Sequence, residues 1–336
     1  MPPSRHRQRR PGAPGPHRDG GPQMAEDQRG HLPRRALLIG AGSLAVLAAA
    51  GAAARTVVGS READGGQSPQ PPETSARHSS PQPAASARLS PVARMRSARP
   101  FTVAHRGGSA DWPEGSQYAY QQAVRTGVDA LEMSVGRTSD GVWFGCHDRT
   151  LDRSSGTNGF VIAEHTWREV QQHTISPPAR YPDQPNRPYW RLDEFIESYK
   201  SSHALWIDPK AAEPELYPEL LALMARHVRQ PKEVFVAKSM AQNTAWAQLS
   251  GAHRIQSWGF YFSSDLDEDP QLLARTQKPW TMFGLDWDAP AQQWRDLSAT
   301  GRPLVAHVLS QRAQRQVALD HGAQGLMIAG VTEVLG

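Results

Sequence analysis

The sequence predicts an α/β protein that folds as a TIM (β/α)8 barrel, and three observations support this. Nine short apolar runs alternate with helix-length segments between residue 101 and the C-terminus. Such alternation indicates parallel strands joined by helical crossovers. This part of the chain has 236 residues, which is close to the roughly 250 residues of a typical barrel. An open doubly wound sheet is the alternative, but the G-x-G-x-x-G motif that would favour it does not follow any of the predicted strands.

The nine runs give the strands in order. They cover residues 101–105, 130–135, 142–147, 204–209, 234–239, 254–262, 281–287, 304–309 and 325–329. The third run follows the second after only a few residues, which include Ser139-Asp140-Gly141. We therefore expect these two to form a small hairpin insertion after the second barrel strand, which leaves eight strands for the barrel. Helices are expected between most strands, for example over 116–126, 192–200, 214–229 and 311–321.

The N-terminal part of the sequence indicates that the protein is exported from the cell. Residues 1–35 form a basic leader in which Met24 offers an alternative start. Residues 36–54 are 19 residues without a charge that follow Arg34-Arg35, an order that resembles a twin-arginine signal, with a small-residue cleavage site at 52–54. The alternative is an uncleaved membrane anchor, because about 20 apolar residues span a bilayer. Both interpretations place the C-terminal part outside the cell or at its surface, the second with membrane association through 36–54.

Between this segment and the barrel, composition predicts a linker. Residues 55–100 are dense in Pro, Ser, Ala, Gly and Gln, and they offer little apolar surface to bury. We expect them to be disordered and the folded domain to cover 101–336.

Charge argues against a nucleic-acid partner. Residues 1–100 hold 15 Lys and Arg against 6 Asp and Glu, a net charge of +9. Residues 101–336 hold 22 against 27, a net charge of −5. The folded domain therefore lacks the basic surface that nucleic acid requires, and a small-molecule substrate is favoured. The single cysteine, Cys146, excludes an intramolecular disulfide.

Polar side chains gather at strand ends, where a parallel barrel has its active site. They are His105, Arg106, Glu132, Ser134, His147, Asp208 and Lys210. Carboxylates bind hard divalent cations, and arginine and lysine neutralise a phosphate. Two histidines can serve as acid and base. The set indicates phosphodiester cleavage.

Each of these residues also has a structural explanation. His147 could be a buried, hydrogen-bonded core histidine, Asp208 a helix cap and Lys210 a solvated loop residue. Glu114 could be a first-turn helix residue favoured by the dipole. Glu132 is harder to explain, since a carboxylate between Leu131 and Met133 is costly to bury unless it is paired or metal-bound.

The motifs resemble those of glycerophosphodiester phosphodiesterases from Phe101 to about Lys210. The family pattern H-R-G occurs at 105–107, P-E-N-T as P-E-G-S at 113–116, E-x-D as E-M-S at 132–134, T-x-D-G at 138–141, H-D at 147–148, and E-x-K as D-P-K at 208–210.

This resemblance implies a TIM barrel that releases an alcohol and glycerol 3-phosphate. It implies His105 and His147 as the acid and base, Arg106 and Lys210 on the phosphate, and Glu114 in support. It also implies Ca²⁺ or Mg²⁺ held near Glu132, Ser134 and Asp208.

Serine at position 134 departs from the family pattern and leaves alternatives open. A hydroxyl is a neutral, weak ligand, so metal affinity should fall. The first alternative function is a barrel that binds a phosphorylated ligand without turnover. The second is a cyclising enzyme of the phospholipase D type.

Overall fold

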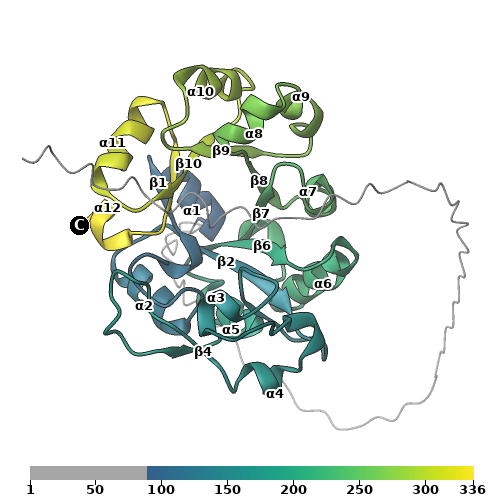
Figure 1. The fold of residues 1–336 in the computed structure, drawn as a ribbon. Helices are drawn as coiled ribbons and strands as arrows, with labels where there is room; N and C mark the ends of the chain where they lie inside the picture. Colours follow the sequence, from purple (N-terminus) through teal and green to yellow (C-terminus); the bar gives the residue numbers. More distant parts are fainter. Residues whose placement is uncertain (1–88) are drawn as a thin grey trace, which may run out of the picture. The chain divides into compact units, whose positions relative to one another are not determined.

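The computed structural model describes residues 89–336, and they contain a closed barrel of eight parallel strands (Figure 1). The strands are β1 (Phe101–Ala104), β2 (Ala130–Arg137), β6 (Ala204–Ala211), β7 (Phe235–Met240), β8 (Gln256–Phe260), β9 (Met282–Asp286), β10 (Leu304–Leu309) and β11 (Gly325–Ile328). The ring closes because β1 pairs in parallel with both β11 and β2. The predicted TIM barrel is confirmed.

Helices surround the barrel, and their apolar faces pack on the outside of the strands (Figure 1). They are α2 (Gln117–Arg125), α5 (Leu192–Tyr199), α6 (Tyr217–His227), α7 (Thr244–Ala252), α8 (Ser263–Glu268), α9 (Leu272–Thr276), α10 (Ala291–Ser298), α11 (Arg312–Asp320) and α12 (Val331–Leu335), with the short 3-10 helices η4 (Pro214–Leu216) and η5 (Pro231–Glu233). These segments include the four helices named from the sequence. Their exposed faces are polar, as expected for helices that cover one side of a core.

The inside of the barrel is filled by large side chains. Trp206 and Trp258 pack against each other with ring centroids 5.4 Å apart. Trp258 fits because Gly284 faces it: a Cβ at Gly284 would lie 2.2 Å from the Trp258 ring. The glycine therefore makes room for a tryptophan that fills the barrel interior, where close packing is required.

A helix that the sequence did not predict closes the amino-terminal end of the barrel. The linker predicted over 55–100 is wrong for its last residues, because α1 (Pro91–Ser97) buries Val92 and Met95. The indole of Trp206 donates a hydrogen bond of 3.3 Å to the sulfur of Met95. Two apolar residues at i and i+3 form one helical face, and the average composition of the segment concealed them.

The remaining N-terminal predictions lie outside the described residues. These are the leader at 1–35, the apolar segment at 36–54 and the first part of the linker. Within residues 89–336, none of the helices is both long and apolar enough to cross a membrane.

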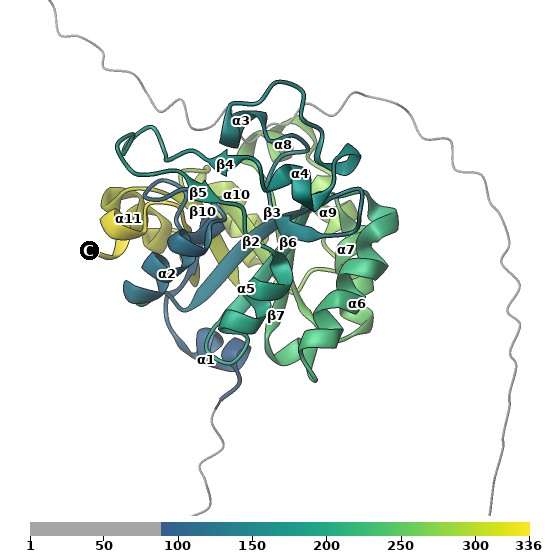
Figure 2. The same cartoon turned by 90° about the horizontal axis from the view of Figure 1, so that it is seen from below.

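The segment between β2 and β6 is larger than a hairpin. β3 (Trp143–Gly145) runs antiparallel to β2. It is followed by α3 (Asp152–Ser155), η3 (Ile162–Glu164), α4 (Trp167–Val170), β4 (Thr174–Ile175) and β5 (Arg187–Pro188). Residues 138–191, called the excursion below, have a small apolar core of their own around Phe144 and Tyr189. Figure 2 shows α3, α4 and β4 at the end of the barrel opposite α1.

Candidate active site

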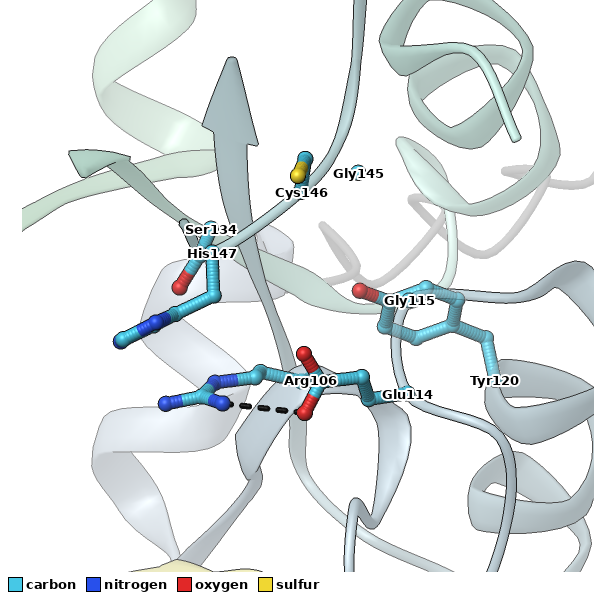
Figure 3. A pocket seen from close by; sticks show the side chains of 8 residues that line it. All are labelled: Arg106, Glu114, Gly115, Tyr120, Ser134, Gly145, Cys146 and His147. Carbon is cyan, nitrogen blue, oxygen red and sulfur yellow. Dashed lines mark hydrogen bonds and ion pairs between the residues drawn. The ribbon is translucent and has the colours of Figure 1, made fainter. Parts of the chain in front are cut away.

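The predicted site residues come together at the carboxyl-terminal end of the barrel, called the mouth below. A small pocket there is lined by residues from the turn after β1, the loop before α2, α2 itself, β2, β3 and the loop after β3. Figure 3 shows Arg106, Glu114, Ser134 and His147 around it. Arg106 and Glu114 are joined by an ion pair across this pocket.

The chain turns sharply where β1 ends, in η2 (His105–Gly107). Arg106 has a φ of 51°, in the left-handed region that costs energy for a residue with a side chain. Its backbone N–H donates a hydrogen bond of 2.7 Å to Glu132 Oε2 on β2. Gly107 and Gly108 follow with φ of 81° and 98°. The carboxylate of Glu132 therefore helps to hold the strained turn that positions Arg106.

A chain of ion pairs connects Arg106 to His147. Arg106 contacts Glu114 at 3.0 Å, and Arg153 contacts the other oxygen of Glu114 at 2.6 Å. Arg153 also contacts Asp148 at 2.6 Å, and Asp148 lies 2.6 Å from His147 Nδ1. Burial alone would raise the pKa of Glu114, but Arg106 and Arg153 outweigh burial and lower it. Glu114 therefore stays ionised and ties the turn after β1 to the excursion.

The ring of His147 is oriented by its hydrogen bond to Asp148. Burial and the charge of Arg106 lower its pKa to about 3, although the hydrogen bond to Asp148 acts in the opposite direction. The neutral ring donates its Nδ1 proton to Asp148 Oδ1, which leaves the Nε2 lone pair available. Such a ring can accept a proton from a hydroxyl or a water molecule.

His105 is the second imidazole at the mouth. It is 5% exposed, and its Nδ1 has no hydrogen-bond partner among the described residues. Burial, followed by the charges of Arg106 and Lys238, lowers its pKa well below the usual value. His105 is therefore neutral, with a buried polar atom that a ligand could satisfy.

Behind the pocket lies a buried cluster of charges. Glu132 and Asp208 are fully buried on β2 and β6, and Lys238 on β7 is 2% exposed. Lys238 Nζ lies 3.0 Å from Glu132 Oε1 and 2.7 Å from Asp208 Oδ2. Burial lowers the pKa of Lys238, but Asp208 and Glu132 outweigh it, and the net shift is upward. Ser134 donates a hydrogen bond of 2.8 Å to Glu132 Oε1.

Lys210 lies two residues after Asp208 on β6. Burial lowers its pKa, while the charge of Asp208 acts in the opposite direction. Its ammonium lies 5.3 Å from the centroid of the Phe260 ring, which also faces Lys238 at 5.2 Å. Phe260 thus borders the site and stabilises two cations through its π-face.

Comparison with known proteins places this barrel in a family. Residues 105–268 match the model of the glycerophosphoryl diester phosphodiesterase family, and this range holds every predicted site residue. The barrel belongs to this family.

Relatives support this assignment. A glycerophosphodiester phosphodiesterase of Bacillus subtilis is 26% identical over 169 residues, 47% of this chain and 57% of the relative. A probable glycerophosphodiester phosphodiesterase 1 of Mycobacterium tuberculosis is 48% identical over 62 residues, 18% of this chain and 23% of the relative. This chain thus spans little more than half the length of the first relative and about a quarter of the second.

Solved structures share the fold. A putative glycerophosphoryl diester phosphodiesterase from Silicibacter pomeroyi has a TM-score of 0.58 at 19% identity and covers 70% of this chain and 92% of its own. A phosphodiesterase from Oleispira antarctica, solved with its product sn-glycerol-3-phosphate, has a TM-score of 0.56 at 19% identity and covers 70% and 95%. At this identity the likeness concerns the fold alone.

Members of the family generally use a divalent metal ion. The ligands expected here were Glu132, Ser134 and Asp208, and their surroundings in this barrel do not fit such an ion. The ammonium of Lys238 contacts both carboxylates, in the space where a cation shared between them would lie. Residues 89–336 contain no group of three His, Cys, Asp or Glu side chains suited to hold a metal.

Three residues that contact the predicted site residues were given no role from the sequence. Lys238 was placed on a strand but not in the site, although a lysine within V-F-V-A-K-S raises the same question of costly burial as Glu132. Asp148 follows His147 directly and could have been assigned as its partner. Arg153 lies in the excursion, and no sequence signal indicates that it reaches both Glu114 and Asp148.

Proposed function

We propose that this protein hydrolyses glycerophosphodiesters to an alcohol and glycerol 3-phosphate. The observation that carries the proposal is a pair of neutral imidazoles at the barrel mouth beside Arg106 and Lys210, of which His105 is buried and the His147 side chain is 9% exposed. Family membership and the product-bound relative favour the same activity. The substrate is a small-molecule phosphodiester derived from phospholipids.

Arg106 and Lys210 are the proposed phosphate ligands. Arg106 Nε is a buried donor without a partner among the described residues, and His105 Nδ1 is a buried ring nitrogen that also has none there. Buried polar atoms are normally hydrogen-bonded, so a bound phosphodiester would supply the hydrogen-bond partners that these two nitrogen atoms lack within the protein. Both cations stabilise the charge that gathers on the phosphoryl oxygens in the transition state.

The two histidines would divide the proton transfers. His147 Nε2 takes the proton from the attacking hydroxyl, whose oxygen then bonds to phosphorus. His105 delivers a proton to the leaving alcohol oxygen as its bond to phosphorus breaks. An anionic phosphate beside His105 favours protonation of the ring, which makes this transfer easier. The attacking hydroxyl belongs to water, which gives glycerol 3-phosphate directly, or to the neighbouring glycerol carbon, which gives a cyclic phosphate that a water molecule then opens to glycerol 3-phosphate.

The test is to incubate the purified full chain with glycerophosphocholine and to measure choline and glycerol 3-phosphate. Wild type should release both in equal amounts, and His147→Ala should lose about 10²- to 10⁴-fold in kcat, the usual contribution of general acid–base catalysis. Glycerol 3-phosphate binding without turnover by wild type would show a binding barrel instead. A cyclic phosphate as the final product in ³¹P NMR would show a cyclising enzyme.

We also propose that the protein is exported, on the basis of the leader at 1–35 and the apolar segment at 36–54. The substrate pool would then be phospholipid breakdown products outside the cell. Fractionation of cells that produce the full chain tests this: replacing Arg34 and Arg35 with Lys should trap the protein inside. Unchanged localisation would contradict the twin-arginine interpretation.

A further inference from the structure

The buried cluster of Glu132, Asp208 and Lys238 has no free place for a metal ion. The side chain of Lys238 is 3% exposed, and those of Glu132 and Asp208 are 0% exposed. Three neighbouring strands supply the groups: Ser134 on β2 pairs in register with Asp208 on β6, and β7 lies next to β6. Solvent cations therefore meet an ammonium that is already in contact with both carboxylates.

The oxygen atoms of the cluster are largely committed. Glu132 Oε1 accepts hydrogen bonds from Lys238 and Ser134, and Oε2 accepts one from the backbone N–H of Arg106. Asp208 Oδ2 accepts from Lys238, and only Asp208 Oδ1 is without a partner among the described residues. Calcium requires about six to eight oxygen ligands and magnesium about six. One carboxylate oxygen and one neutral hydroxyl would supply only a small part of the oxygen ligands that either ion requires.

The charges of the cluster nearly balance without a metal. Two carboxylates and one ammonium leave one negative charge, and the ammonium of Lys210 lies over the same Phe260 ring as that of Lys238. A third carboxylate at position 134 would require a cation of higher charge. With serine there, a single lysine suffices, and a divalent ion beside its ammonium would be repelled.

We propose that Lys238 is a built-in cation that replaces the divalent metal ion in this barrel, so that the site works without added metal. This inference rests on the proposed function. Lys238 is a positioning residue: its ammonium holds Glu132, and Glu132 holds the left-handed turn at Arg106. Arg106 and Lys210 meet the phosphate directly, in the role that a metal ion would otherwise share.

The first test measures metal binding and metal dependence of the full-length wild type. Calorimetry with Ca²⁺ and with Mg²⁺ should show no saturable binding at millimolar concentration. Release of glycerol 3-phosphate from glycerophosphocholine should change less than twofold when EDTA is added. Stoichiometric binding of either ion, with a loss of more than tenfold in kcat on chelation, would overturn the proposal.

The second test exchanges the cation. Lys238→Met keeps the length of the side chain and removes its charge, so kcat in EDTA should fall about 10²-fold, as expected when a reacting group is misplaced by about 1 Å. Combining Lys238→Ser with Ser134→Asp supplies a third carboxylate, and this variant should bind Ca²⁺ and regain activity only with the ion. Lys232→Met is the matched control, since Lys232 is exposed on η5 just before the same strand, and it should behave as wild type.

The outcomes separate the two proposals. Wild-type activity of Lys238→Met in EDTA would contradict the role of Lys238. Absence of turnover by wild type with or without metal would contradict the proposed function, while calorimetry on wild type and on the double variant would still decide whether Lys238 excludes the ion. A Lys238→Met protein that does not fold leaves the wild-type titration as the deciding measurement.

Discussion

At the scale of single residues, the site depends on polar groups that are buried and paired in chains. Glu132 accepts hydrogen bonds from Ser134, Lys238 and the backbone of Arg106. Glu114 joins Arg106 to Arg153. Removing one member leaves a buried partner uncompensated, and this costs more than the pair itself contributes. Substitutions here should therefore disturb geometry as well as charge.

Asp148 fixes the tautomer and orientation of His147. We expect Asp148→Ala to lower kcat about 10²-fold at pH 7, because the ring loses the acceptor that keeps its Nε2 unprotonated. Steady-state kinetics with glycerophosphocholine measures this. Arg149→Ala is the control, because Arg149 is 56% exposed in a surface ion pair with Glu213 and should change kcat less than twofold. An unchanged kcat in Asp148→Ala would mean that His147 needs no carboxylate.

The pKa of about 3 for His147 also predicts how stability depends on pH. Unfolded histidine titrates near 6.5, so between pH 6.5 and 3 the unfolded state binds more protons than the folded state, and stability falls as pH falls. From pH 7 to pH 5 this one residue should cost about 2 kcal/mol of unfolding free energy. Measured by urea unfolding, the fall in unfolding free energy from pH 7 to pH 5 should be smaller in His147→Gln than in wild type by that amount.

The comparison for this experiment is His253→Gln, at an exposed position directly after α7. It should keep the pH dependence of wild type. If unfolding free energy fell equally steeply with decreasing pH in wild type and in His147→Gln, the lowered pKa of His147 would be contradicted.

At the scale of elements, α1 is the part of the fold that composition concealed. It covers the amino-terminal end of the barrel interior through Val92 and Met95, which pack with Phe101 and Trp206. A helix of seven residues is not stable in isolation, so it forms because the open barrel end offers apolar surface. The folded domain therefore begins before Pro91 rather than at Phe101.

We expect Met95→Ala in the full chain to destabilise the barrel by about 2–5 kcal/mol, the usual cost of truncating a buried methionine. Met95 is 1% exposed and loses its contact with the Trp206 indole in this variant. Leu89→Ala is a matched control, since Leu89 is 58% exposed, and it should change stability by less than about 0.5 kcal/mol. Urea denaturation compares the two, and equal effects would mean that α1 does not close the barrel.

At the scale of the whole molecule, three apolar cores of different size within residues 89–336 support one site. The barrel has a large core between its strands and helices and a second core inside the strands, whereas the excursion has a small one around Phe144, Leu151 and Tyr189. His147 and Asp148 come from the excursion, and Glu132, Asp208 and Lys238 come from the barrel. Integrity of the site therefore requires both parts.

We expect the excursion to open before the barrel unfolds, because a small core protects its backbone less than a large one. Hydrogen exchange followed by mass spectrometry should show faster exchange for peptides within 152–188 than for peptides of β6 and β7. Substrate or glycerol 3-phosphate should slow exchange in the loop that carries His147. Equal protection across excursion and barrel strands would contradict this division.

Local patterns in the sequence are enough to predict the barrel and the polar residues that gather at its mouth. Strands and helices follow from local periodicity, and parallel strands place their carboxyl ends at one mouth, so the positions of His105, Glu132 and Asp208 follow from the sequence. What neutralises the two buried carboxylates is visible only in the folded chain. Lys238 lies 106 residues after Glu132 and 30 after Asp208, and the register of strands that pair across such distances is not a local property. The same reason applies to Arg153 and to α1, whose roles depend on contacts with distant parts of the chain.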